Sequence, residues 1–247
     1  MGSSERLSLK DALTPFSAIM QADLEGLLKS KITYGWLTAA VFLQVIRVLS
    51  SAPFGKMSRI VTEGLSDFIY IWSMIIIGLS ASAISSETGE LADSIMSKSV
   101  KRSDYILAKF SSRIIYTLLI YSVVTTVLVG ASLKMLDNNY EAYGLISAIL
   151  FVALALILLT TVGVTLSTVI PNTVIAIVAL LVLWYSMTFF FPLLDLEVLS
   201  PSKLMNWLPD IIQGLWNGEE WKMATGFAVT SIVFIALSTL YFSIKDL

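Results

Sequence analysis

The sequence predicts an all-α membrane protein that crosses the bilayer six times. Of its 247 residues, 56% are hydrophobic and only 14% are charged, whereas charged residues make up about 25% of a soluble domain. The mean hydropathy is +0.82, and the apolar residues gather in runs long enough to cross a hydrocarbon core of roughly 30 Å as helices. We therefore expect a polytopic bundle with three additions: an N-terminal amphipathic interfacial helix, a cytoplasmic helix between spans two and three, and a broken outer hairpin between spans five and six.

The composition also excludes several kinds of chemistry. The chain has no cysteine and no histidine, which rules out disulfides, thiolate nucleophiles, His-based metal sites and His acid–base catalysis. A net charge of −2 gives no excess of basic residues to hold nucleic acid. Gly55–Lys56 is not a phosphate loop, because Met57 follows where Ser or Thr is required. We expect no catalytic residues, no metal site and no cofactor in this chain itself.

Residues 8–31 predict an amphipathic helix that lies in the membrane interface. Its apolar residues recur at three- and four-residue intervals: Phe16, Ile19, Met20, Leu24, Leu27 and Leu28. Polar residues such as Asp23 and Glu25 face elsewhere, which is the pattern of an interfacial helix. The alternative is that this stretch is an extended start of the first span.

Six apolar runs are long enough to span a bilayer: 32–50, 68–85, 105–133, 143–169, 173–191 and 223–244. The first is the weakest because Gln44 and Arg47 interrupt it, although Arg47 lies near its end and can snorkel to the headgroups. The turn Ile170–Pro171–Asn172 predicts a hairpin between the fourth and fifth runs. Acidic residues fall only at the ends of these runs, so we expect no ion relay at membrane depth.

The distribution of basic residues predicts the orientation. Six spans place both termini on one side, together with the segment between the second and third spans. That side carries ten Lys and Arg residues and the other side carries six. By the positive-inside rule, we expect a multi-pass protein of the cell membrane with both termini in the cytoplasm.

The charged segment 86–103 joins the second and third spans. Its charges follow the order that complements a helix dipole, with Glu87, Glu90 and Asp93 before Lys98, Lys101 and Arg102. Leu91 and Ile95 share one face and form a narrow apolar stripe. An exposed stripe on a cytoplasmic helix indicates docking into the groove of a partner protein. The alternative is a solvated loop made helical by its composition.

The outer connection, residues 195–222, is longer than a simple link needs. Ser200 and Pro201 indicate the start of a helix, and Pro209 is expected to break it before a second short apolar helix. The tryptophans of this connection are Trp207, Trp216 and Trp221. Two half-helices with these anchors predict a re-entrant or interfacial hairpin at an aromatic belt. An ordinary interfacial loop with aromatic anchors is the alternative.

The order of these parts resembles the integral-membrane permease subunits of type-2 ABC transporters, over nearly the whole chain. The most specific likeness lies in SETGELADSIMSKSVKRSDYILAKF, from Ser86 to Phe110. The positions that match the family's pattern are Glu87, Gly89, Leu91, Ile95, Ser97, Lys98, Val100, Arg102, Ser103 and Lys109. Two positions depart from it: Ser99 stands where proline is common, and Glu90 where threonine is common.

The resemblance implies a half-transporter that pairs with a second permease copy and rests on a cytoplasmic ABC ATPase subunit, which binds the ATP and Mg. The short helix would be a coupling helix seated on that ATPase through Glu87, Gly89, Glu90, Leu91, Ile95, Lys98, Lys101 and Arg102. The family's central pathway lies at the first and fifth spans, so Val178 and Leu181 are expected at the permease dimer seam. We expect export of amphipathic or lipid-like cargo. The alternatives are a six-span substrate-binding membrane subunit and a non-transporting scaffold or sensor.

Overall fold

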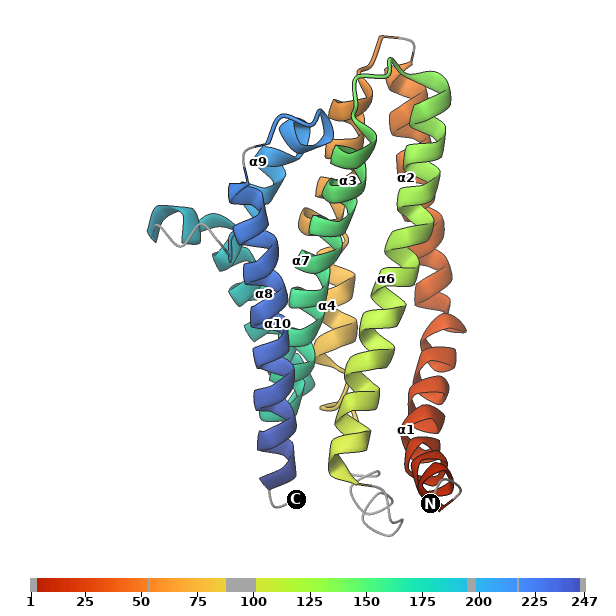
Figure 1. The fold of residues 1–247 in the computed structure, drawn as a ribbon, viewed down its shortest axis with the longest axis vertical. Coiled ribbons are helices and arrows are strands. Elements are labelled where there is room, and N and C mark those ends of the chain that lie inside the picture. The colour runs from red at the N-terminus through yellow and green to blue at the C-terminus, as the bar shows by residue number, and fades with distance from the viewer. Residues whose placement is uncertain (1–3, 53, 88–100, 195–198, 217, 245–247) are drawn as a thin grey trace.

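The computed structural model describes residues 4–52, 54–87, 101–194, 199–216 and 218–244. Within these ranges the protein is helical, without a β-strand, and forms an elongated bundle (Figure 1). The helices are α1 (Ser4–Leu28), α2 (Lys31–Ser51), α3 (Met57–Tyr70), α4 (Ser73–Ala81), α6 (Arg102–Met135), α7 (Ala142–Val169), α8 (Thr173–Phe189), the 3₁₀ helix η1 (Phe191–Leu194), α9 (Pro201–Ile212) and α10 (Glu219–Ile244). The prediction of an all-α protein is confirmed.

Five helical segments in the described ranges are long and apolar enough to cross a membrane. They are Lys31–Ser51, Met57–Ala81, Arg102–Met135, Ala142–Val169 and Glu219–Ile244. The expected fifth span, 173–191, forms α8, which is apolar but only 17 residues long. The structure therefore supports a membrane protein with five helices of spanning length in the described residues, and the sixth span remains a prediction.

Helix α7 forms the centre of the bundle. Helices α4, α6, α8, α9 and α10 all pack against it, and its large side chains, such as Phe151, Leu156 and Leu159, are buried. A helix that is apolar on all sides is stable only when it is surrounded in this way or by lipid. The start of α1, the start of α6 and the end of α10 lie together at one end of the bundle (Figure 1).

The turn between α7 and α8 follows the sequence prediction. Helix α7 ends at Val169 and α8 begins at Thr173, and the two helices pack against each other as a hairpin. The Asn172 side chain accepts hydrogen bonds from the N–H groups of Val174 and Ile175, at 3.0 and 3.2 Å. This side-chain cap satisfies two of the donors that every helix start leaves unpaired.

The second span is longer than predicted and is interrupted. It begins at Met57 rather than at residue 68, and α3 gives way to α4 at Ile71 and Trp72. The N–H groups of both residues donate to the carbonyl oxygen of Asp67, each at 2.8 Å, so the helix widens locally as in a π-bulge. Such a widening leaves main-chain carbonyls without their usual helical partners.

Two side chains of α8 bond to carbonyls at this interruption. The Trp184 Nε1–H group donates to the Ile69 carbonyl at 3.1 Å, and the Tyr185 hydroxyl donates to the Tyr70 carbonyl at 2.7 Å. Where a helix breaks in a low-dielectric environment, neighbouring helices must satisfy the freed groups in this way. Helix α8 therefore stabilises the interruption.

Helix α9 lies across the ends of α3 and α7 (Figure 1). It runs without a break through Pro209, so the predicted break at this residue is wrong. Pro209 costs about 3 kcal/mol inside a helix, but Leu208, Ile211 and Ile212 are all fully buried, and each such burial contributes about 1.5 to 3 kcal/mol. Packing outweighs the proline, and the expected second half-helix is replaced by a turn at Gly214, whose φ is 76°.

The contact between α7 and α9 requires Gly144. A Cβ at this position would lie 2.1 Å from the Ile211 carbonyl oxygen, and main-chain oxygens cannot move aside as a flexible side chain can. We expect Gly144→Ala to destabilise the protein by about 1 to 3 kcal/mol, seen as a lower melting temperature in detergent. Gly130→Ala is the matched control, because a Cβ there meets nothing within 4 Å. Equal losses at both positions would contradict this packing argument.

Candidate functional site

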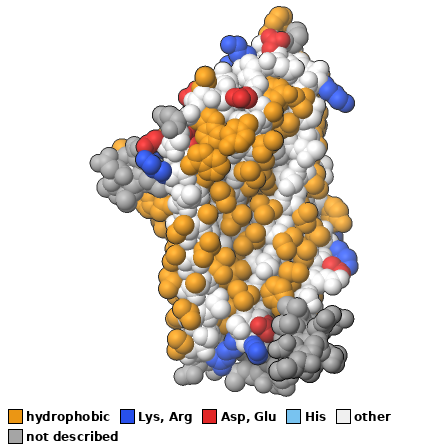
Figure 2. Space-filling view, in the orientation of Figure 1, with side chains coloured by type: hydrophobic (Ala, Val, Ile, Leu, Met, Phe, Trp, Pro, Cys, Tyr) orange, Lys and Arg blue, Asp and Glu red, His pale blue; other side chains and the backbone are white. Residues whose placement is uncertain are grey.

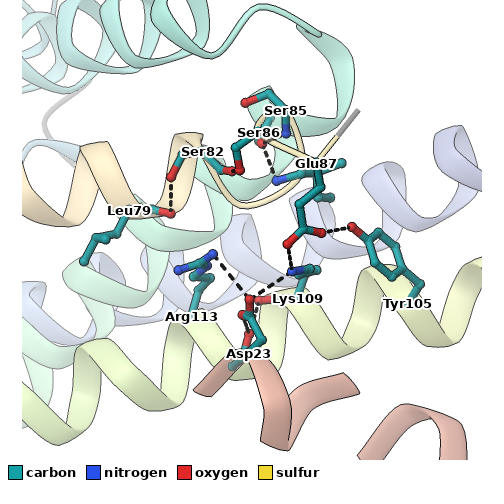
Figure 3. Close-up of polar contacts among 12 residues, drawn as sticks. Asp23, Leu79, Ser82, Ser85, Ser86, Glu87, Tyr105, Lys109 and Arg113 are labelled. Atoms are coloured by element: carbon teal, nitrogen blue, oxygen red, sulfur yellow. Dashed lines mark hydrogen bonds and ion pairs between the residues drawn. The ribbon is translucent and has the colours of Figure 1, made fainter. Parts of the chain in front are cut away.

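A group of charged and hydroxyl side chains lies where α1, α6 and the turn after α4 meet (Figure 3). We call it the buried ion cluster, and its members are Asp23, Glu87, Tyr105, Lys109, Ser112 and Arg113. Asp23 comes from α1, Glu87 from the turn 82–87, and the other four from the first three turns of α6. The cluster thus joins three segments that are far apart in the sequence.

Lys109 is the centre of the buried ion cluster. Its side chain is 4% exposed, and its Nζ donates to Asp23 Oδ1 at 2.9 Å and to Glu87 Oε1 at 2.6 Å. The other Glu87 oxygen, Oε2, accepts from the Tyr105 hydroxyl at 2.5 Å. Burying an ammonium group costs several kcal/mol unless it is paired and hydrogen-bonded. Lys109 therefore binds α1 and the turn 82–87 to the same helix.

Asp23 is held by three groups of α6. Besides Lys109, the Ser112 hydroxyl donates to it, and Arg113 Nη2 lies 3.5 Å from Oδ1. Burial raises the pKa of Asp23, but attraction to Arg113 and Lys109 and the Ser112 hydrogen bond outweigh it and lower the pKa below its ordinary value of 3.8. A carboxyl with a lowered folded-state pKa contributes stability that is complete above the unfolded value and is lost as pH falls through the folded one. The contacts of Asp23 with α6 are therefore intact at neutral pH.

The turn 82–87 is fixed on α7. The N–H groups of Ile84 and Ser85 both donate to the Ser167 hydroxyl, at 2.8 and 2.9 Å. Ile84 also belongs to a small buried apolar cluster with Tyr105, Phe110 and Phe242, among others. These contacts set the direction in which Glu87 points toward Lys109.

A second polar link holds the junction of α1 and α2 against α6. The Thr33 hydroxyl donates to the Leu27 carbonyl at 2.6 Å and shares a hydrogen bond of 2.7 Å with the Tyr116 hydroxyl. Trp36 packs on the Tyr116 ring at 5.9 Å between centroids. Helix α1 is thus attached to α6 at two levels.

The structure describes only part of the predicted ATPase-docking segment. Glu87 has both carboxylate oxygens bound within the chain, Lys101 is exposed before α6, and Arg102 is the first residue of α6. Gly89, Glu90, Leu91, Ile95 and Lys98 lie outside the described residues.

The two predicted dimer-seam residues lie on α8. Val178 is 54% exposed and Leu181 is 37% exposed. Both side chains are therefore available at the surface of the single chain, as a seam between two copies requires.

A second polar group lies at the opposite end of the bundle, between α2 and α3. We call it the α2–α3 ladder, and its members are Gln44, Arg47, Arg59, Glu63 and Asp67. Arg47 binds Asp67 through two nitrogens, at 2.6 and 3.1 Å. Asp67 lies ten positions after Met57, the first residue of the second span. The expectation that Arg47 snorkels to headgroups is therefore wrong, as is the placement of acidic residues only at span ends.

The two polar groups are alike in their chemistry. Each consists of paired carboxylates and cations in which the charges neutralise one another, a pattern that fixes helices relative to each other rather than one that activates a nucleophile.

No protein-family model matches the sequence, and a search of curated proteins finds no relative.

Proposed function

We propose that this chain is the membrane-spanning permease subunit of an ATP-driven ABC transporter, acting as an exporter. The observation that carries the proposal is the buried ion cluster. It joins α1 and α6 at Glu87, where the chain enters the predicted coupling segment. Lys109 of α6 binds both Glu87 and Asp23 of α1. A displacement of the predicted coupling segment would therefore move α1 and α6 together.

Helix α6 has the length to carry such a movement across the molecule. Its 34 residues correspond to roughly 50 Å of helix, and it packs against α1, α2, α3, α7 and α10. Movement at its first turns is therefore transmitted to most of the bundle. This supports a role in which a cytoplasmic motor drives the membrane helices.

The remaining parts of the proposal follow the family resemblance. Helix α8 would complete six spans, with both termini and residues 86–103 in the cytoplasm of a multi-pass cell-membrane protein. A separate ABC ATPase would bind ATP and Mg, and two permease copies would meet at α2 and α8, near Val178 and Leu181. The exposed apolar side chains of α8, including Val174 and Val182, support such a seam.

Replacing the predicted docking stripe tests the proposal. We expect the double variant Leu91→Asp/Ile95→Asp to abolish binding to the proposed ABC ATPase subunit. Two carboxylates would have to be buried unpaired in the partner's groove, at a cost of several kcal/mol. The measurement is co-purification of the two subunits and ATP hydrolysis by the complex.

The single variant Asp93→Asn is the control, because residue 93 lies off the stripe on a helical wheel. It should leave binding and hydrolysis unchanged. A Leu91→Asp/Ile95→Asp variant that stays fully bound and fully active would overturn the coupling role and remove the main support for the transporter.

A further inference from the structure

A pocket of about 570 Å³ opens between the end of α2 and the start of α3. It lies at the end of the bundle that is remote from both chain ends (Figure 1). Its walls include Ser51, Phe54, Lys56, Arg59, Ile60 and Glu63, and we call it the α2–α3 pocket. Figure 2 shows charged side chains gathered at this end, above a broad hydrophobic surface.

The hydrogen-bonding groups left over in the α2–α3 pocket are cationic donors. Glu63 accepts from Arg59 Nε at 2.9 Å and lies 3.9 Å from Arg47 Nε, and the carboxylate of Asp67 behind it is bound by Arg47. The Lys56 ammonium and the terminal nitrogens of Arg59 have no hydrogen-bond or ion-pair partner among the described residues. Both carboxylates thus already face cations, whereas Lys56 and the terminal nitrogens of Arg59 can donate to an anionic ligand.

The first two N–H groups of α3 are already bonded within the chain. The N–H of Met57 donates to the Asp137 carbonyl at 3.1 Å, and the N–H of Ser58 donates to the Asn139 side chain at 2.9 Å. A ligand would thus be read by the Lys56 and Arg59 side chains. Both are suited to a phosphate group, Arg59 as a planar fork and Lys56 as a point charge.

The α2–α3 pocket also has an apolar wall, formed by Phe54 and Ile60. Phe54 is 91% exposed, so its ring is available to an apolar chain. These side chains lie beside a cationic site at the end of a helix of membrane-spanning length. A ligand that satisfies both surfaces has an anionic head and apolar chains.

We propose that the α2–α3 pocket binds the phosphate group of an anionic phospholipid. Lys56 and Arg59 bind the phosphate, and the acyl chains leave the pocket along Phe54. The site goes beyond the transporter proposal and does not depend on it, because the argument uses only residues of this pocket and of α2.

A fluorescent reporter at the pocket tests the inference. The chain has no cysteine, so Ser51→Cys can be labelled with a polarity-sensitive dye, and Asn138→Cys provides a reporter at the same end but outside the pocket walls. Dihexanoyl phosphatidylglycerol, dihexanoyl phosphatidylcholine and inorganic phosphate are titrated in an uncharged detergent. We expect a saturable response to phosphatidylglycerol at position 51 and none at position 138.

Charge-neutral variants identify the phosphate ligands. Lys56→Gln and Arg59→Gln should each weaken phosphatidylglycerol binding about 5-fold, and the double variant about 30-fold. Lys134 is an exposed cation in the last turn of α6, outside the pocket walls. The control Lys134→Gln should leave the affinity unchanged. Native mass spectrometry of the unchanged protein should also retain phosphatidylglycerol over phosphatidylcholine, a readout that does not rely on any variant.

Three results would overturn the proposal. Equal affinities for phosphatidylcholine and phosphatidylglycerol would mean that the pocket does not select for a net negative headgroup. Inorganic phosphate binding as tightly as phosphatidylglycerol would show a site for a free anion rather than for a lipid. Parent affinity in the double variant would place the lipid elsewhere.

Discussion

Lys109→Met should destabilise the protein by about 3 to 5 kcal/mol, the usual cost of leaving a buried charge without its partner. The substitution keeps the length of the side chain but leaves Asp23 and Glu87 facing one space without their shared cation. Their side chains are only 11% and 27% exposed, so water cannot replace the ammonium group fully. Unfolding in detergent, followed by the fluorescence of the six tryptophans, measures the loss.

The double variant Glu87→Gln/Lys109→Met is the matched control. It removes one carboxylate together with the cation and leaves Asp23 bound to Ser112 and Arg113, so most of the lost stability should return. If the single variant unfolds like the parent, Lys109 does not hold α1 and the turn 82–87 to α6, and the route proposed for coupling fails.

Asp67→Leu should destabilise the protein by about 3 kcal/mol, because Arg47 remains in the bundle without its bidentate partner. The Arg47 side chain is only 18% exposed, and Gln44 beside it is fully buried. Glu63 lies 3.9 Å from Arg47 and can replace Asp67 in part. Adding Glu63→Gln should therefore cost more than the sum of the two single changes.

Two further variants separate burial from charge in this experiment. Gln44→Leu/Arg47→Met/Asp67→Leu removes all three side chains that bond to one another and should be close to the parent in stability. Arg59→Ala removes a cation that is 80% exposed and should cost less than about 1 kcal/mol. In the α2–α3 ladder Arg59 is exposed, whereas Asp67 is nearly buried. An Arg59→Ala variant as unstable as Asp67→Leu would contradict the conclusion that burial decides the cost.

Apolar run length was sufficient to predict most of the helices, but not α3. The residues Arg59, Glu63 and Asp67 recur at every fourth position of that helix, which a hydropathy count interprets as a segment outside the membrane. Their partner, Arg47, belongs to α2 and is 20 positions away from Asp67. Only the pairing of the two helices makes this polar face compatible with burial, and a single sequence does not contain that pairing.

The buried ion cluster was predictable only in part. Lys109 and Arg113 are four residues apart on α6, next to apolar residues such as Ile106 and Phe110, and two cations on such a face require carboxylates nearby. The sequence offers several acidic residues at that end, and Asp23 lies 86 positions from Lys109. The position of Lys109 and Arg113 among apolar residues of α6 indicates that both cations need carboxylate partners. Which carboxylates these are depends on how α1 packs against α6.

The interruption between α3 and α4 has a mechanical consequence. The carbonyls of Ile69 and Tyr70 are bonded by Trp184 and Tyr185 of α8, and separating them would leave main-chain oxygens unsatisfied in a medium that offers no replacement. Helix α8 also packs against α4, and the Ser73 hydroxyl of α4 lies 3.4 Å from the Tyr185 hydroxyl. A displacement of α8 would therefore act on both halves of the second span at their interruption.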